Sequence, residues 1–431
     1  MTALTIKDPQ RRGVCPGLSV PMATGDGLLV RLLPIGPIPL TAFAALCAAA
    51  RIHGNGVLEV TARGSIQVRG LNRESAPLFA ASVAALNITA GDGIPVLSNP
   101  LAGLDATDAI DAAALAAELR RALAQKSLAK RLSAKVSVVI DGGGTLNLDN
   151  IAADVRLGAE KMASGVVALR VAVGGDRASA TLLGVIPVER SVETVVRLLE
   201  AVVQCGAKAR TRDIIATERV AVLHSAVADL LIADEQTPTA AKPCDVIGTH
   251  ALRDGSFAVG LGLAFGHANA TSLEHLIAAA KAAGAGSVQP AARRALMAIG
   301  LPQNKLSAFA HAAGQLGFIV RADDPRRHVI ACAGAPVCAS AHIAARAIGP
   351  RITAIAAPHI DGSFKIHVSG CAKGCAHPTR AGLTVVGTPD GCALVKNGSA
   401  REAPFAVVSA DDLPNAVPQV VQQLRLEGGH G

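Results

Sequence analysis

The sequence predicts an α+β protein built from two related halves. Short apolar runs with strand character alternate with Ala-rich stretches whose apolar residues recur at helical spacing. The segment Ala233–Pro243 is the best linker in the chain, and the pattern of the first half recurs after it. Such a repeat predicts two copies of one unit, related by pseudo-twofold symmetry around a shared cleft. Chance similarity between two Ala/Gly-rich segments is the alternative.

Composition narrows the class of protein. A chain of 431 residues is too long for one ordinary core, so we expect two or more domains. The longest apolar stretch, Ile35–Ala50, contains two prolines and is too short to span a membrane. Nine cysteines without a visible export signal predict a cytoplasmic protein. The net charge of +8, without Lys/Arg runs, argues against nucleic acid and favours a small polyanionic ligand.

The elements of the first half follow from periodicity and from turn residues. Asp108 is expected to cap a helix, because a carboxylate there can accept hydrogen bonds from free backbone N–H groups. The other elements we expect are a strand over Leu28–Leu33, a helix over Thr41–Ala50, one strand over Gly56–Arg69, a strand over Lys135–Ile140 and a helix over Val192–Gln204.

The repeat is carried by landmarks that occur in the same order in both halves. The block that runs from Asp26 to Leu71 matches the block from Asp254 to Leu301, with Arg63 opposite Arg293. Further on, the Ser98-Asn99-Pro100 loop takes the place of the loop at Cys332, and Lys135–Gly143 takes that of the segment ending at Cys371. Only the second copy has cysteines in these loops.

Four cysteines form two pairs. Cys332 and Cys338 are spaced C-x5-C, and Cys371 and Cys375 are spaced C-x3-C. Thiolates are soft ligands for zinc, copper(I) and iron–sulfur clusters, and four of them suit a cubane. Glycines and a proline place both pairs in turns. The sequence therefore predicts a [4Fe–4S] cluster on these four residues, with zinc and inert buried cysteines as alternatives.

The spacing of the two pairs resembles that of the sulfite/nitrite reductase superfamily. The resemblance implies a duplicated architecture of ferredoxin-like half-domains and two related α+β domains, with Cys375 nearest the tetrapyrrole. On this basis we place half-domains at 20–90 and 245–315, and the α+β domains at 91–235 and 316–431. The last of these would carry the cluster.

Thr61–Gly70 resembles the superfamily strand that contacts the carboxylates of sirohaem. By strand parity Arg63, Gln67 and Arg69 share one face, and a guanidinium can hold a carboxylate through two hydrogen bonds. An ordinary solvated strand face is the alternative. The predicted substrate-binding residues, including those implied by the repeat and by the second cysteine pair, are Arg63, Gln67, Arg69, Lys135, Arg293, Lys373 and His377.

The chain departs from the reductases where they hold their small anion. In Leu132–Ser137 one lysine, Lys135, survives, and the other basic positions are Ala134 and Ser137. Each lost charge-assisted hydrogen bond is worth about 1.5–3 kcal/mol, so sulfite should bind poorly.

These departures, together with the segment Arg12–Leu18 and the run Ser369–Pro378, resemble the precorrin-3B synthase family of cobalamin-pathway monooxygenases. That resemblance implies hydroxylation of precorrin-3A at C20 by O2, with γ-lactone formation. A sirohaem-dependent assimilatory sulfite or nitrite reductase is the alternative.

No Gly-x-Gly-x-x-Gly unit follows a strand, so we do not expect this chain to bind NADH itself. We expect a separate electron-donating reductase to deliver NADH-derived electrons. The resemblance also implies a mononuclear non-haem iron. His359, Asp361, His367 and His377 are candidate ligands, with His377 favoured, because two histidines and a carboxylate form a common iron site. No residue is assigned as catalytic.

Overall fold

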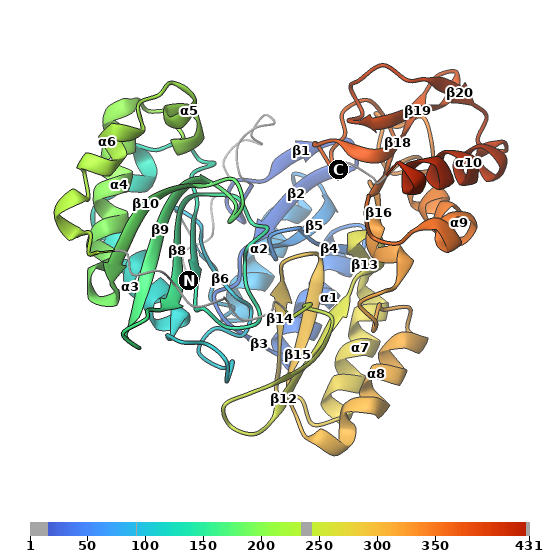
Figure 1. Ribbon diagram of the computed structural model, residues 1–431. Helices are drawn as coiled ribbons and strands as arrows, with labels where there is room; N and C mark the ends of the chain where they lie inside the picture. The colour runs from blue at the N-terminus through green and yellow to red at the C-terminus, as the bar shows by residue number, and fades with distance from the viewer. Residues whose placement is uncertain (1–15, 92, 234–243, 428–431) are drawn as a thin grey trace.

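The computed structural model describes residues 16–91, 93–233 and 244–427. Two sheets form the central part of the molecule, and two lobes, drawn green and red in Figure 1, stand above it on either side. Apart from Ala233, the predicted linker lies outside the described residues.

The two central sheets exchange a strand. The first has the order β1 (Met22–Thr24), β2 (Gly27–Leu32), β5 (Ile66–Leu71), β4 (Val57–Val60) and β13 (His267–Asn269). The second has the order β11 (Gly248–Ala251), β12 (Phe257–Gly262), β15 (Ala295–Leu301), β14 (Ser287–Ala291) and β3 (Ile38–Pro39). Each sheet thus takes its last strand from the other half of the chain, and the two halves match strand for strand.

The two lobes repeat the same correspondence. The sheet of the first lobe is β6 (Val96–Ser98), β7 (Val138–Asp141), β8 (Ala153–Lys161), β9 (Val167–Gly175) and β10 (Thr181–Pro187). That of the second is β16 (Val329–Ala331), β17 (Ile366–Ser369), β18 (Ala381–Thr388), β19 (Gly391–Gly398) and β20 (Ala406–Val408). In both sheets the first three strands run parallel to one another. The fourth strand is antiparallel to the third, and the fifth is antiparallel to the fourth. The predicted α+β fold with internal duplication is confirmed.

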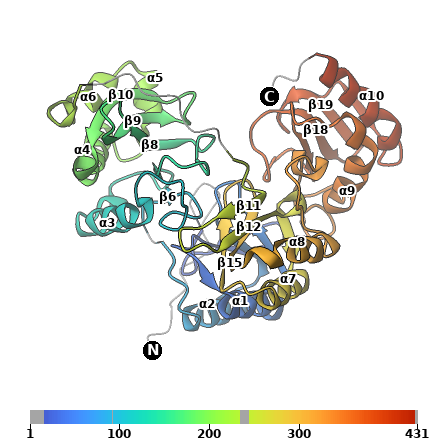
Figure 2. The ribbon, with the colours of Figure 1, turned by 60° about the horizontal axis from the view of Figure 1, so that its bottom comes forward.

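The helices cover one apolar face of each sheet. Those of the central sheets share one core and lie together in Figure 2: α1 (Leu40–His53), α2 (Ser75–Ala85), α7 (Ala270–Ala282) and α8 (Leu306–Gln315). The first lobe has α3 (Ala112–Gln125), α4 (Ser191–Cys205), α5 (Thr211–Ala216) and α6 (Val220–Ser225). The second has α9 (Ala345–Ala356) and α10 (Leu413–Leu426). Because the central helices pack on one side, the opposite side of the first sheet is left for polar side chains such as Gln67 and Arg69. The opposite side of the second sheet carries Met297 and Ile299, which pack in a separate apolar cluster.

One predicted strand is a hairpin. The segment predicted as a single strand over Gly56–Arg69 forms the antiparallel pair β4 and β5. Gly64 has a φ of +81° at the turn, and the hydroxyl of Thr61 accepts hydrogen bonds from the backbone N–H groups of Arg63 and Ser65. A positive φ and local side-chain bonding both favour a turn over an extended strand. Arg63 therefore lies on the turn, not on the strand.

The predicted helix cap is also displaced. Asp111 accepts hydrogen bonds from the N–H groups of Ala113 and Ala114 at the start of α3, whereas Asp108 is buried and accepts from Asn99. The helix begins three residues later than Asp108 would require, so the nearer carboxylate caps it.

Candidate functional site

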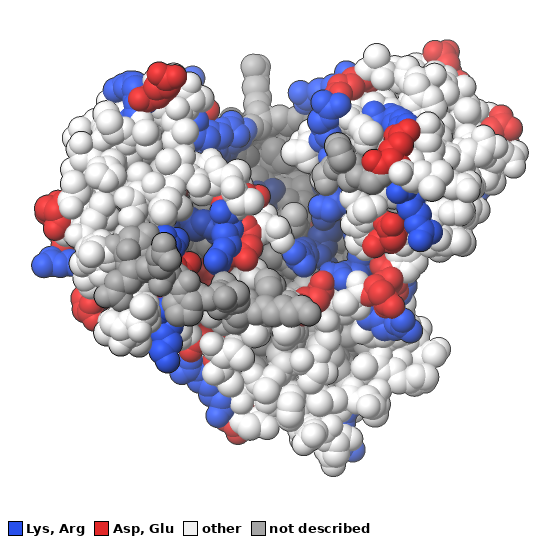
Figure 3. Space-filling view, viewed as in Figure 1, with Lys and Arg blue, Asp and Glu red and all other residues white. Residues whose placement is uncertain are grey.

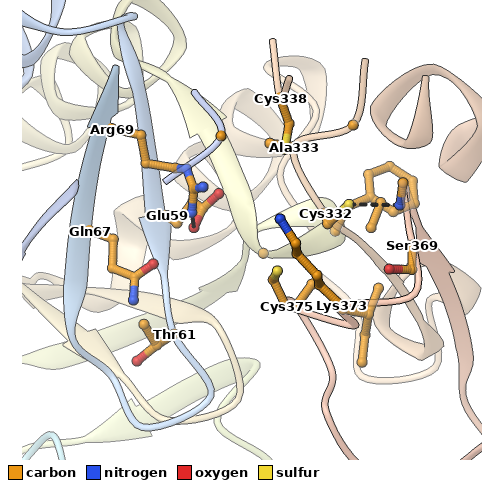
Figure 4. Close-up of a pocket in the computed structure, with 18 of the residues that line it drawn as sticks. Glu59, Thr61, Gln67, Arg69, Cys332, Ala333, Cys338, Ser369, Lys373 and Cys375 are labelled. Atoms are coloured by element: carbon orange, nitrogen blue, oxygen red, sulfur yellow. Dashed lines mark hydrogen bonds and ion pairs between the residues drawn. The ribbon is translucent and has the colours of Figure 1, made fainter. Parts of the chain in front are cut away.

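The four cysteines predicted as ligands line one cavity of about 240 Å³. Cys332 follows β16 directly, and Cys371 follows Gly370 at the end of β17. These strands are parallel neighbours, so the loops after them meet at one edge of the sheet. Figure 4 shows Cys332, Cys338 and Cys375 facing the polar side chains of β4 and β5 across the cavity. The second lobe thus supplies the thiols and the first central sheet supplies the opposite wall.

The backbone around the thiols is closely fitted. The N–H group of Gly370 donates to Cys332 Sγ at 3.0 Å. Burial raises the pKa of the Cys332 thiol, and the N–H groups of Gly370 and Gly334 oppose that shift. A Cβ on Gly25 would lie 2.3 Å from Cys338 Sγ, so only glycine permits this approach. N–H donors toward sulfur are suited to a ligated thiolate.

The thiols surround a space and do not converge on a point. Within the described part of the chain, no three His, Cys, Asp or Glu side chains are arranged to hold a single metal ion. A single zinc ion needs four ligands at about 2.0–2.3 Å from one centre. A cubane instead takes one thiolate on each of its four irons, so it requires thiols distributed around a cavity. The residues present therefore fit a four-iron cluster better than zinc.

The opposite wall is an ion-pair network on the first central sheet. Arg69 donates to Asp26 through two hydrogen bonds of 2.7 Å each, and its Nη1 lies 3.5 Å from Glu59. Arg346, on α9, pairs with the other oxygen of Glu59 at 3.2 Å. Within β5, Ile66 and Val68 face the core while Gln67 and Arg69 face the cavity, as strand parity predicts. The network joins the two domains that enclose the cavity.

A larger cleft of about 1070 Å³ adjoins this cavity. The two share Arg31, Gln67, Arg69 and Cys375 in their linings, and Cys375 is the one described cysteine that lines both. Figure 3 shows Lys and Arg side chains on the walls of the hollow between the two lobes. The charged residues that line the cleft are Arg31, Arg63, Arg69, Lys135, Asp154, Arg210 and Arg212. Six cations and one carboxylate make it suited to an anionic ligand.

Five of the predicted substrate-binding residues line one of these spaces. Arg63, Gln67, Arg69 and Lys135 line the cleft, and Lys373 lines the cysteine cavity, where it donates to Ser340 at 2.6 Å. Arg63 reaches across to the first lobe. Its guanidinium donates to Ser137 Oγ at 3.1 Å and to the Ala152 carbonyl at 2.6 Å.

Two predicted residues line neither space. Arg293 is exposed and lies 3.5 Å from Asp245. His377 Nε2 is 3.1 Å from both the Arg380 carbonyl and the Thr379 hydroxyl. The neighbouring Arg294, which sequence reasoning missed, lines the cysteine cavity instead.

Arg31 and Arg210 were also missed. Arg31 pairs with Gln67 across β2 and β5, a register that the strand pattern contains but does not reveal alone. Arg210 donates two hydrogen bonds to Asp154, which is buried and also accepts from the N–H groups of Ser137 and Thr211.

The candidate iron ligands do not form a triad. His367 is buried on β17, and its two ring nitrogens have no partner. Burial lowers the pKa of His367 to about 3, with His377 and Arg294 adding to the effect. Its ring packs edge-on against His377, 5.7 Å away. Asp361 is occupied by Ser363 and Arg425, and these residues with His359 do not converge on one point.

Comparison with known proteins assigns the chain to a family. A curated precorrin-3B synthase from Sinorhizobium sp. is 35% identical over 416 residues, which cover 96% of this chain and 89% of that protein. The chain belongs to the precorrin-3B synthase family. The predicted family and the predicted oxidoreductase class are thereby confirmed.

More distant relatives agree with the fold. Residues 20–86 match the nitrite/sulfite reductase ferredoxin-like half domain. The assimilatory ferredoxin-dependent nitrite reductase of Haloferax mediterranei is 26% identical and covers 86% of this chain and 72% of its own length. The structure of the Mycobacterium tuberculosis NirA protein superposes with a TM-score of 0.71 at 19% identity, over 94% of this chain and 82% of that one. No helix within the described residues is long and apolar enough to cross a membrane.

Proposed function

We propose that this chain is a precorrin-3B synthase that uses O2 to hydroxylate precorrin-3A at C20, with closure of a γ-lactone. The observation that carries the proposal is the basic cleft of about 1070 Å³ that meets the cysteine cavity at Cys375. Small-molecule pockets reach about 1,000 Å³, so this cleft suits a large ligand such as a tetrapyrrole. The family membership supports the same assignment.

Cys332, Cys338, Cys371 and Cys375 would hold a [4Fe–4S] cluster. Such a cluster supplies single electrons to a bound substrate. The chain directs the N–H group of Gly370 at the Cys332 sulfur and closes the cavity from the side of Gly25 and Arg69. Cys375, which lines both spaces, lies between the cluster position and the ligand cleft.

The cleft residues would bind and orient the substrate. A precorrin carries many carboxylates, and guanidinium groups can hold each of them through two hydrogen bonds. Arg31 and Arg63 present cations from the first central sheet, and Lys135 presents one from the first lobe. The ion pair with Asp154 holds the Arg210 side chain in one orientation. Binding a ligand carboxylate there costs less side-chain conformational entropy than it would at a mobile arginine.

The reaction transfers one oxygen atom of O2 to the macrocycle and releases the other as water, which requires two electrons and two protons. We propose that a separate reductase delivers NADH-derived electrons to the cluster. No iron-binding triad is assigned to this reaction, since the described His and Asp candidates do not converge.

The test is an absorption and EPR spectrum of protein purified without oxygen, with iron, acid-labile sulfide and extracted tetrapyrrole quantified. We expect about four irons and four sulfides per chain and no sirohaem. On adding precorrin-3A, reductant and O2, the product should be heavier by one oxygen atom. An unchanged substrate mass with an intact cluster would refute the proposal.

A sirohaem-dependent reductase is the second candidate, because the Haloferax relative is a nitrite reductase. Ala134 and Ser137 line the cleft beside Lys135, so two of the positions at which the reductases are expected to carry cations are neutral in this chain. Stoichiometric sirohaem with turnover of sulfite or nitrite would establish this function in place of the first.

A further inference from the structure

Arg294 links the second half of the chain to the loop that carries Cys375. It lies in the turn between β14 and β15 and lines the same cavity as the four cysteines. Its Nη2 donates to the carbonyl of Ala376, the residue after Cys375, at 3.2 Å. A residue from a central sheet therefore holds the backbone of the loop that reaches between the cavity and the cleft.

The turn is shaped to aim this side chain inward. Arg293 and Arg294 both have a φ of +62°, an uncommon conformation for residues other than glycine. The two side chains diverge: Arg293 is exposed beside Asp245, and Arg294 enters the cavity. A Cβ on Gly266 would lie 2.5 Å from Arg294 Cδ, so the opposite wall leaves room for it. Strained backbone that persists at a cavity points to a functional constraint.

The charge of Arg294 has few counterions nearby. Burial lowers the pKa of its guanidinium, and Glu59 is the anion that opposes this. An arginine nevertheless stays protonated in proteins. Its remaining charged or titratable neighbours include His367, His377 and Lys365, which are basic groups. The guanidinium is thus a cation directed at the thiol cavity and only partly neutralised by carboxylates.

We propose that Arg294 is a positioning residue that fixes the Cys375 loop through Ala376 and whose charge raises the reduction potential of the cluster. The inference rests on the proposed [4Fe–4S] cluster. Reduction adds a negative charge to the cluster, so a nearby cation in a low-dielectric site stabilises the reduced form. The hydrogen bond and the charge act on the same loop, and they can be separated by substitution.

The test compares Arg294→Gln, Arg294→Lys and the control Arg293→Gln in the cluster-bearing protein. The readouts are iron and sulfide content, the EPR spectrum and the midpoint potential from a redox titration. We expect a lower potential and a changed EPR spectrum in Arg294→Gln, a potential near that of the wild type in Arg294→Lys, and no change in Arg293→Gln. A wild-type potential in Arg294→Gln, or an equal shift in both Arg294 variants, would overturn the inference.

If Arg294→Gln does not accumulate as folded protein, Arg294→Met takes its place. Methionine removes the charge and keeps an unbranched side chain in the cavity. A lower potential then supports the inference and an unchanged potential overturns it. Wild-type protein without a four-iron cluster would overturn the proposed function itself, whereas a normal cluster that is indifferent to Arg294 overturns this inference alone.

Discussion

Arg69 holds Asp26 through two hydrogen bonds of 2.7 Å each, and the Asp26 side chain is fully buried. Asp26 lies in the turn between β1 and β2, next to Gly25, whose carbonyl accepts a hydrogen bond from the Ala339 N–H group. Ala339 follows Cys338, so the ion pair supports the contact between the first central sheet and a cysteine loop. Arg69 was predicted to bind substrate carboxylates, but two carboxylates of this chain already engage it. These ion pairs support the cavity wall, and the predicted contact of Arg69 with substrate stays a prediction.

The first prediction concerns this pair. Burial raises the pKa of Asp26, but the hydrogen bonds and charge of Arg69 outweigh it and hold the pKa below 3.8. A depressed pKa contributes stability that is complete above the unfolded value and is lost as the pH falls through the folded value. Asp26→Asn should therefore reduce the free energy of unfolding by about 3 kcal/mol at pH 7, and the difference should shrink below about pH 3.8.

Thermal unfolding at pH 7 and pH 3 checks this. Asp323→Asn is the matched control, since Asp323 pairs with Arg321 at an exposed site where the pair contributes little. An equal difference between wild type and Asp26→Asn at both pH values would contradict the assignment.

The second prediction is that Arg63→Ala weakens binding of the tetrapyrrole substrate and leaves the cluster spectrum intact. Losing one charge-assisted hydrogen-bond pair costs about 1.5–3 kcal/mol, which corresponds to about a 10- to 100-fold higher Kd. Ligand titration followed by absorbance measures it. Arg293→Ala should bind as the wild type does, because Arg293 lines neither space. Equal affinity in Arg63→Ala would place the carboxylate contacts on other residues of the cleft.

The third prediction is that Cys371→Ser abolishes the cluster. A serine hydroxyl is a poor substitute for a soft thiolate ligand, so the iron and sulfide content should fall to near zero. Because the ligand loops form one edge of the second lobe, we also expect that lobe to become more susceptible to proteolysis. Cys244→Ser, at an exposed cysteine away from the cavity, should keep the cluster. Unchanged iron and sulfide in Cys371→Ser would remove Cys371 from the ligand set.

Sequence reasoning succeeded where a local pattern determines the structure. The spacing of the two cysteine pairs and their position in turns predicted that these residues lie together, and Cys332 and Cys371 do line one cavity. Period-two alternation correctly separated Ile66 and Val68 from Gln67 and Arg69. The repeat was visible because both copies keep the same order of strands, turns and helices.

It failed where the outcome depends on one dihedral angle or on a distant partner. Gly64 turns one predicted strand into a hairpin, and no periodicity separates that glycine from one inside a strand. Arg293 and Arg294 are adjacent and chemically identical, so only the conformation of the turn decides which enters the cavity. The exchange of β3 and β13 between the central sheets is a long-range pairing that no local pattern specifies.

The last prediction concerns the first-half counterpart of the cysteine cavity. Asn99 follows β6 as Cys332 follows β16, and its amide donates to both oxygens of Asp108 at 3.1 and 3.0 Å. A Cβ on Gly142 would lie 2.9 Å from the Asp108 carboxyl carbon, so this space is filled by the buried pair. In the first half a hydrogen-bonded carboxyl occupies the place that thiols surround in the second.

Burial raises the pKa of Asp108 to about 6; the Asn99 hydrogen bonds oppose this shift, and the charges of Asp105 and Asp141 add to it. The folded state therefore binds the proton more tightly than the unfolded state, and stability falls as the pH rises from about 4 to about 6. Asp108→Asn, which is neutral, should melt about 2 °C higher than the wild type at pH 7.5 and equally at pH 4. Exposed Asp411→Asn is the control. A wild-type melting temperature that is flat between pH 4 and pH 7, with no gain in Asp108→Asn, would show that the carboxyl is ionised throughout that range.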